Sequence, residues 1–511
     1  MSTKLDSNKL IVKNTIMLYI RMLLTMVVSL YTSRVILEAL GIENFGIYNV
    51  VGGVVAMFSF LKTAMSTSTQ RFLTFELGKG NIEQLKKVFA SSLNIHIGVC
   101  ILLVLLSESL GLWFLNTQMS IPNDRILAAN WVFQFSILSF CLTIIQTPFI
   151  ASIIAHEKMN VFAYMSIVDV LLKLLIAYVV IIVTFDKLIF YAILVFVVHF
   201  FIFLLYLCYC YRNFFECRFS IERDKILYKQ LTSFAGWNLF GSIVWLLKKQ
   251  GINILLNVFF GPIINASCGL AMQVSHAVTG FVSNFQTALN PQITKNYAQG
   301  NVSYMEGLAY KGSKYSFYLL FFISFPLLLN IEYVLHLWLV EVPNYTSLFV
   351  QLIVIESLIS VIWGNTMIVS MMATGKIKNY QLAVSFVLFM IVPISYVVLK
   401  LGCDVSYVFY VSIVMTLLAG VLRFSFCHKQ IGYSYRRMIS EVLWPIIRVV
   451  VISVPSLLLI RKQYFVNRDF LSFILLVLIT LVIVFTTIWF VGLQRNERNV
   501  IIKIVKSKLY K

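Results

Sequence analysis

The chain has 511 residues, of which 60% are hydrophobic and only 12% are charged, and its formal net charge is +20. The mean hydropathy of +0.88 excludes an ordinary soluble protein, because a folded core cannot bury so large a share of apolar side chains. Lipid is therefore the expected solvent for most of the chain. The eight cysteines lie mostly within apolar runs and form no Cys-x-x-Cys pair, which favours buried thiols over a metal site.

Long apolar runs separated by short polar breaks predict an all-α polytopic membrane protein with about 14 transmembrane helices. In chain order the predicted spans are 14–37, 46–66, 85–107, 126–150, 161–183, 189–211, 231–259, 264–289, 311–332, 346–370, 381–400, 405–427, 441–460 and 471–491. The polar start leads directly into the first span without a small-residue cleavage site, so we expect no signal peptide. None of the predicted loops is long enough to fold as a domain.

The basic residues follow the loops of this predicted topology. With the N-terminus inside, 27 Lys and Arg fall on the inner segments and six in the outer loops. The positive-inside rule then places both termini in the cytoplasm. The excess positive charge is explained by topology, with anionic lipid headgroups as neighbours, and this argues against a nucleic-acid partner.

Two segments of the chain, 41–81 and 261–301, resemble each other at a constant separation. Six pairs are identical: Gly41/Gly261, Val54/Val274, Thr67/Thr287, Thr74/Thr294, Gly80/Gly300 and Asn81/Asn301. A second match, 155–158 with 373–376, has nearly the same separation. We therefore predict two six-span repeats that cross the membrane in the same direction, related by an axis along the membrane normal.

The repeat sets the predicted domain boundaries. They are an N-terminal six-helix bundle over 1–211, a cytoplasmic linker over 212–230, a C-terminal six-helix bundle over 231–427, and two additional transmembrane helices with a cytoplasmic tail over 428–511.

Ionisable residues within the predicted spans are the candidate binding residues, because a charge at bilayer depth is costly and by default faces a cavity or a partner. The candidates for substrate binding are Arg21, Arg34, Lys62, Asp169, Lys173, Lys248 and Lys249. Basic residues outnumber acidic ones among them. This balance favours an anionic ligand, since Arg and Lys bind phosphate and carboxylate oxygens.

The candidates in the first span have alternative roles. Arg21 shares one helix face with Asn14 and Thr25, which suits either a water-filled cavity or hydrogen bonds between helices. Arg34 lies near the outer end and can instead pair with Glu38 one turn later.

The other candidates are also open to structural roles. Lys248 and Lys249 differ by 100° around their helix, so we expect only one of them to face a cavity squarely. Asp169 and Lys173, four residues apart, can neutralise each other. Lys62, near the inner end of its span, can extend to the interface.

Three further charges complete the set within the spans. Glu356 can pair with a base across a cavity, whereas Arg423 and Arg448 are expected at the interface or against lipid. The chain has neither a Gly-x-x-x-x-Gly-Lys-Ser/Thr loop nor a His-Glu-x-x-His motif, so we expect no ATPase, no catalytic residues, and no metal or other cofactor.

Two motifs resemble a known family. The segment from Arg34 to Tyr48, R-x₆-G-I-E-N-F-G-I-Y, resembles the R-x-L-G-x-x-x-Y/F-G-x-Y signature that follows the first span of polysaccharide flippases. The segment QRFLTFELGKGN, from Gln70 to Asn81, resembles the exit of their second span. These O-antigen and lipid-linked oligosaccharide flippases belong to the multidrug/oligosaccharidyl-lipid/polysaccharide exporter superfamily.

The resemblance implies a transporter, not an enzyme, that moves an undecaprenyl-diphosphate-linked oligosaccharide across the bacterial inner membrane by alternating access, for synthesis of surface polysaccharide or lipopolysaccharide. It implies two six-helix bundles around a central cavity. A glycan polymerase is a candidate partner, and we expect a monomer in contact with membrane lipids.

Two alternatives follow from the same sequence. A cation-coupled multidrug exporter of the superfamily would need a membrane-embedded carboxylate near the first span, which has none. A membrane enzyme such as a glycan polymerase or ligase would present a sizeable outer loop, and no such loop is predicted.

Overall fold

The computed structural model describes residues 2–119, 121–218, 224–339, 341–464, 470–499 and 502. Within these residues every regular element is a helix. Twelve helical segments are long and apolar enough to cross a membrane. The expected all-α polytopic membrane chain is therefore confirmed.

The predicted number of about 14 spans exceeds these twelve segments, and the difference lies in 46–66 and 264–289. The first range straddles the junction of α1 (Ser2–Ala56) and α2 (Ser59–Lys79). The second lies within α10 (Pro262–Ala298). Both α2 and α10 are helical along their length but rich in Ser, Thr, Asn and Gln, so they fall short of the hydropathy of an apolar span.

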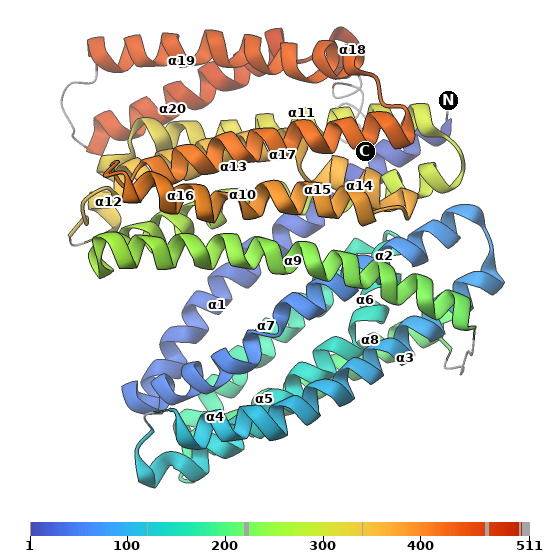
Figure 1. Ribbon diagram of the computed structural model, residues 1–511, viewed down its shortest axis with the longest axis vertical. Coiled ribbons are helices and arrows are strands. Elements are labelled where there is room, and N and C mark those ends of the chain that lie inside the picture. The colour runs from blue at the N-terminus through green and yellow to red at the C-terminus, as the bar shows by residue number, and fades with distance from the viewer. Residues whose placement is uncertain are drawn as a thin grey trace. The chain divides into compact units, whose positions relative to one another are not determined.

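The chain divides into two compact units, which are described separately. The N-terminal unit comprises Leu10–Ser242, and the C-terminal unit comprises Met1–Lys9 with Ile243–Lys511. Figure 1 shows that the long helices within each unit lie side by side.

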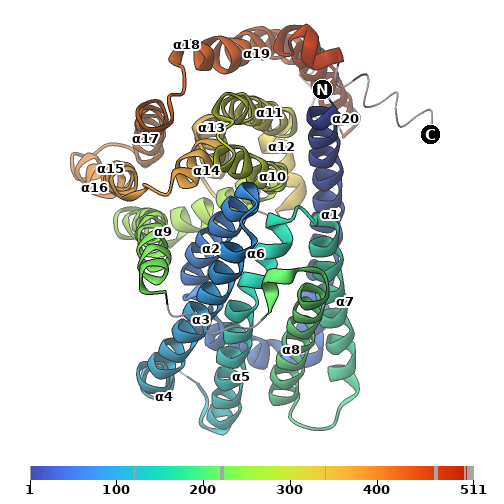
Figure 2. The ribbon, with the colours of Figure 1, turned by 90° about the vertical axis from the view of Figure 1, so that its right-hand side faces the viewer.

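The N-terminal unit contains most of α1, then α2, and the first part of α9. Between them lie α3 (Ile82–Leu106), η1 (Ser107–Gly111), α4 (Leu112–Thr117), η2 (Asn123–Arg125), α5 (Ile126–Ile145), α6 (Thr147–Ala155), α7 (Met159–Ile182), α8 (Lys187–Asn213) and η3 (Phe215–Cys217). Helix α2 packs against α3 and α6 (Figure 2). Apolar side chains of α1, α3, α4, α5 and α8 form the main core of this unit.

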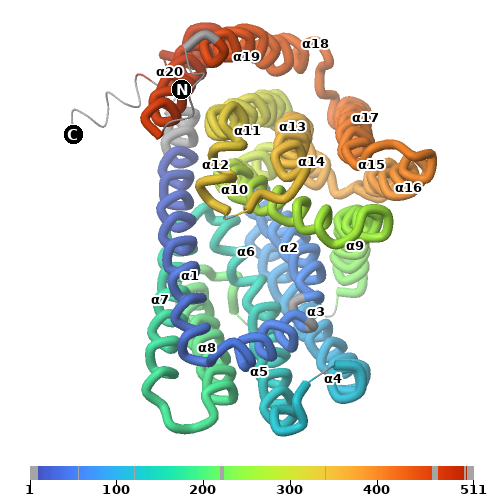
Figure 3. Tube along the Cα trace, turned by 90° about the vertical axis from the view of Figure 1, so that its left-hand side faces the viewer, coloured from blue at the N-terminus to red at the C-terminus, as the bar shows by residue number. Residues whose placement is uncertain are grey.

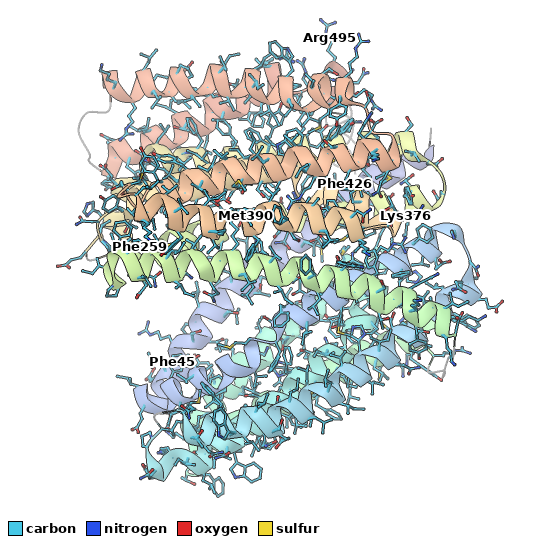
Figure 4. All side chains as sticks on the ribbon, viewed as in Figure 1. Phe45, Phe259, Lys376, Met390, Phe426 and Arg495 are labelled. Atoms are coloured by element: carbon cyan, nitrogen blue, oxygen red, sulfur yellow. The ribbon has the colours of Figure 1, made fainter. Side chains whose placement is uncertain are left out.

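The C-terminal unit begins within α9 (Lys225–Phe260) and continues through α10. It then contains α11 (Val302–Leu329), α12 (Ile331–Trp338), α13 (Thr346–Trp363), α14 (Asn365–Thr374), α15 (Lys378–Phe389), α16 (Ile391–Lys400), α17 (Tyr407–Ile431), α18 (Tyr435–Met438), η4 (Ile439–Leu443), α19 (Trp444–Tyr464), α20 (Phe470–Thr487) and η5 (Ile488–Gly492). Side chains fill the space between these helices, with Phe259 and Lys376 at opposite ends of the unit (Figure 4).

The glycines of the sequence repeat adopt matching backbone conformations. Gly41 bends α1 at φ 77° and ψ 165°, and Gly261, between α9 and α10, has φ 81° and ψ −176°. The bend in α1 is visible in Figure 3. Gly80 and Gly300, which follow α2 and α10, are both left-handed, with φ of 72° and 76°. L-residues with a Cβ rarely adopt these conformations, which explains why both copies carry glycine.

A second correspondence lies further along each repeat. Helices α5 and α6 are separated by a break at Gln146, and α13 and α14 by a break at Gly364. The number of residues between these two breaks is the same as the number between Ala155 and Ala373 in the second sequence match. Pro148 is the second residue of α6, and Gly364 adopts φ −83° and ψ −119°, outside the helical region. The duplicated sequence therefore encodes duplicated local structure.

Two ion pairs, one of them fully buried, connect the last helices of the chain to α11. Lys314 donates to both oxygens of Glu497 at 2.7 and 2.8 Å, and the two side chains are only 2% and 6% exposed. Nearby, Arg437 pairs with Glu306, which also accepts from the Tyr310 hydroxyl. Because an unpaired charge at these positions would be very costly, α11 can pack in this way only with both partners in place.

We expect Glu497→Gln to destabilise the purified protein by about 3–5 kcal/mol, because it leaves the Lys314 ammonium buried without a counter-charge. The midpoint of thermal unfolding in detergent should fall clearly. The double variant Lys314→Met with Glu497→Met should recover most of the loss. The control Glu83→Gln makes the same change at a carboxylate that is 81% exposed and pairs with Lys87, and it should leave the midpoint nearly unchanged. Equal effects of Glu497→Gln and Glu83→Gln would contradict the assignment.

The repeat glycines give a second prediction. Replacing Gly261 by Ala should cost about 1–2 kcal/mol of stability, since its φ is positive while no atom lies within 4 Å of the added Cβ. Gly269, within α10, also has open space around the added Cβ but helical geometry, so Gly269→Ala should be neutral or stabilising. Thermal unfolding of the two variants distinguishes backbone strain from steric conflict.

Candidate functional site

The first candidate site is a group of charged side chains in the N-terminal unit. Lys173 donates to Asp169 at 2.9 Å within α7. Lys62 of α2 and His199 of α8 lie within electrostatic range of both members of this pair. Three helices thus bring their ionisable residues to one place.

Two further residues extend this group toward α1. The Arg21 guanidinium lies 4.7 Å from the centroid of the Phe162 ring, on α7. Tyr206 of α8 lies within electrostatic range of both Arg21 and Asp169. We call Arg21, Lys62, Asp169, Lys173, His199 and Tyr206 the N-terminal charge cluster.

The N-terminal charge cluster contains three basic side chains, Arg21, Lys62 and Lys173, and one carboxylate. Asp169 pairs with Lys173, so basic groups outnumber carboxylates within the cluster, among helices that form candidate membrane spans, apart from the more polar α2. At such depth, positive charges interact strongly with any anion that reaches them, because the local dielectric is low. The cluster is therefore suited to holding an anionic group.

The second candidate site is a cavity of about 650 Å³ in the C-terminal unit. Its walls come from α9, α10, α13, α14, α15 and α17. Hydroxyl and amide side chains supply much of the lining: Ser275, Thr279, Ser283, Gln286, Ser357, Ser360, Asn365 and Thr416. We call this space the C-terminal cavity.

An ion pair crosses the C-terminal cavity between α9 and α13. The Lys248 ammonium donates to Glu356 Oε1 at 2.6 Å, and the Thr416 hydroxyl donates to the same oxygen at 2.9 Å. Both charged side chains are less than one-fifth exposed. The pair is electrically neutral as a whole, and the hydroxyl of Thr416 fixes the position of the carboxylate.

Two more cations line the same cavity. Lys249 lies 5.8 Å from the centroid of the Trp245 ring and within electrostatic range of His276. Arg423 of α17 lies beside Tyr380. Within the described part of the chain, neither Lys249 nor Arg423 forms an ion pair, so the C-terminal cavity has a positive surplus.

The structure groups the predicted site residues as follows. It brings Arg21, Lys62, Asp169 and Lys173 together, while Lys248 and Lys249 both line the C-terminal cavity. The expectation that only one of the two lysines would face a cavity needs correction: long side chains from adjacent positions reach the same space. Arg34 is exposed on α1, outside the N-terminal charge cluster.

The predictions from the sequence left out some residues of these sites and placed another one elsewhere. Arg423 was expected at the interface or against lipid but lines the C-terminal cavity. The base that pairs with Glu356 is Lys248. His199 and Tyr206 were not predicted as site residues, although their separation of seven residues places them on one face of α8. Among the described residues, no group of His, Cys, Asp or Glu could hold a metal ion.

Comparison with known proteins assigns the chain to a family. The model of a family described as "Polysaccharide biosynthesis protein" matches residues 11–297, more than half of the chain. The chain belongs to this family. No curated protein matches it.

Solved structures identify the fold. A MATE transporter in the bent conformation superposes with a TM-score of 0.73 at 13% identity, over 85% of this chain and 98% of that one. An outward-facing multidrug resistance MATE family transporter of the MOP superfamily gives 0.70 at 13% identity, over 83% and 96%. A MOP superfamily transporter from Pyrococcus furiosus gives 0.68 at 13% identity, also over 83% and 96%. The family member described here thus has the fold of a multi-pass membrane transporter, not of an enzyme.

The N-terminal charge cluster leads to a prediction about its single carboxylate. Asp169→Asn should lower stability by roughly 1–3 kcal/mol, because Lys173 loses its partner while Lys62 still repels it. The exchange Asp169→Lys with Lys173→Asp keeps the pair and should restore most of the loss. Thermal unfolding of the single and exchanged variants tests this, and equal midpoints for all three proteins would show that the pair has no structural role.

Proposed function

We propose that this family member is a flippase that moves an undecaprenyl-diphosphate-linked oligosaccharide across the bacterial inner membrane by alternating access, for surface polysaccharide or lipopolysaccharide synthesis. The observation that carries the proposal is the positive surplus of both candidate sites in a chain of the polysaccharide biosynthesis family. A diphosphate is a compact anion that such sites can hold.

The chemistry of the two sites matches different parts of this substrate. In the N-terminal charge cluster, Arg21 and Lys62 are the candidates to hold phosphate oxygens, while Asp169 keeps Lys173 partly neutralised. In the C-terminal cavity, Lys249 and Arg423 are not ion-paired within the described residues. Its hydroxyl and amide side chains suit sugar hydroxyls, which both donate and accept hydrogen bonds.

The proposal also includes the membrane topology. We propose that α2 and α10 cross the bilayer as polar spans, which gives 14 spans, in two parallel six-span repeats followed by two further helices. The matching conformations of Gly41 with Gly261 and of Gly80 with Gly300 support the repeat. Polar residues within a span are tolerated where they line an aqueous cavity. Cytoplasmic termini, a monomeric state and a glycan polymerase as partner belong to the same proposal.

A cation-coupled multidrug exporter is the alternative, because multidrug transporters share the fold. A cationic drug would meet positive charge in both sites, which disfavours this function. The Pyrococcus furiosus transporter is described by the reverse polarity of its binding pocket, which suggests a different function for that protein. Differences in pocket charge are thus compatible with one fold and different cargoes.

The proposal is tested in a strain whose surface polysaccharide depends on this protein. The variants Arg21→Gln with Lys62→Gln, and Lys249→Gln with Arg423→Gln, should each reduce surface polysaccharide roughly tenfold or more. The reason is that losing one hydrogen bond to a charged group costs about 1.5–3 kcal/mol. Lipid-linked oligosaccharide should accumulate on the inner leaflet.

Lys400→Gln is the matched control, since it removes an exposed base at the end of α16 and should leave export unchanged. Membrane levels of each variant are compared by immunoblot. Normal surface polysaccharide in both double variants would reject the assignment of these residues. Altered susceptibility to cationic drugs on overexpression, with polysaccharide unchanged, would favour the exporter.

A further inference from the structure

A cationic and aromatic site lies at the ends of two spans of the N-terminal unit and shares no residue with either candidate site. The Lys86 ammonium of α3 lies 3.6 Å from the centroid of the Phe215 ring, and the Arg218 guanidinium lies 5.0 Å from the same centroid. Phe215 itself is 52% exposed. Both positive groups therefore lie against one accessible ring.

The neighbouring carboxylates are committed to other bases. Glu216 is buried and lies 2.6 Å from His156 Nε2, and Glu83 lies 2.9 Å from Lys87. Among the described residues, neither Lys86 nor Arg218 forms an ion pair. Two cations that share one ring and have no carboxylate partner among these residues would both gain from an anion bound beside the ring.

The short helix η3 holds this arrangement in place. Phe214 stacks on the His156 ring with centroids 4.2 Å apart, and the Cys217 thiol contacts the Ser152 hydroxyl at 3.6 Å. Both contacts attach η3 to the end of α6. The cation pair is therefore positioned before any ligand arrives, which reduces the entropy lost on binding.

The position of the site indicates the kind of ligand. The apolar span of α3 begins at Ile82, and that of α8 ends at Asn213, one residue before Phe214. Tyr211 and Leu204 of α8 lie on the span side of Phe215, seven residues apart on one helix face, and both are exposed. Charged groups at the end of a span, next to exposed aromatic and apolar side chains within it, match a lipid, with its phosphate at the membrane surface and its acyl chains below.

We infer that Lys86, Phe215 and Arg218 bind the phosphate of an anionic phospholipid, of which phosphatidylglycerol is the simplest example. The lipid phosphate accepts hydrogen bonds from the ammonium and the guanidinium at the edge of the Phe215 ring, and its acyl chains run along Tyr211 and Leu204. Each base near an anionic lipid surface strengthens binding roughly fivefold, so the pair should give roughly 30-fold.

Purified full-length protein in detergent is titrated with phosphatidylglycerol or phosphatidylcholine, and bound lipid is counted by native mass spectrometry. Wild type should retain phosphatidylglycerol at least tenfold more strongly than phosphatidylcholine. Lys86→Gln with Arg218→Gln should lose most of this preference. The charge-conserving Arg218→Lys should keep it and shows whether the site tolerates substitution without unfolding.

Arg212→Gln is the matched control, because Arg212 is an exposed base in the last turn of α8 that is not placed on the Phe215 ring. It should keep the preference for phosphatidylglycerol. The inference is overturned if wild type shows no preference, if the double variant keeps it, or if Arg212→Gln removes as much of it as the double variant. The readout is lipid binding alone, so it is independent of the proposed transport function.

Discussion

The cost of carrying charge within a bilayer is the constraint on which this structure depends. Several ionisable side chains reduce that cost by pairing with an opposite charge. Lys314 is enclosed with Glu497, Lys248 is paired with Glu356, and Lys173 with Asp169. The first pair joins the final helices to α11, whereas the other two lie where a ligand could reach them. The degree of burial thus distinguishes the structural pair, Lys314 with Glu497, from the two pairs that belong to the candidate binding sites.

Much of the fold could be predicted because the bilayer imposes a length of about 20 apolar residues on each span. Two helices depart from this rule. The sequence predicts spans at 46–66 and 264–289, but α2 and α10 have so many hydroxyl and amide side chains that they do not qualify as apolar spans, and both follow a glycine of the sequence repeat. Because α2 and α10 are both polar, we infer that polarity is required at these two places in the chain. A chance loss of hydrophobic residues would be expected in one of the two helices, not in both.

The candidate sites were less predictable, for a geometric reason. Asp169 and Lys173 are one helical turn apart, so their ion pair can be read from the sequence. Lys248 and Glu356 are separated by 108 residues, and only the packing of α9 on α13 brings them together. Arg423 was misplaced because the position of a base along a span does not reveal which side of the helix faces a cavity. Angular orientation is a tertiary property.

The positive φ that Gly41 and Gly261 share indicates how the two similar segments have diverged. Backbone conformations that require glycine persisted in both halves after a duplication, while almost every side chain around them changed. The carboxylates show this divergence most clearly: Asp169 belongs to the fifth predicted span of its half and Glu356 to the fourth of the other. The two segments therefore keep a common backbone frame, whereas the charged residues around it differ between them.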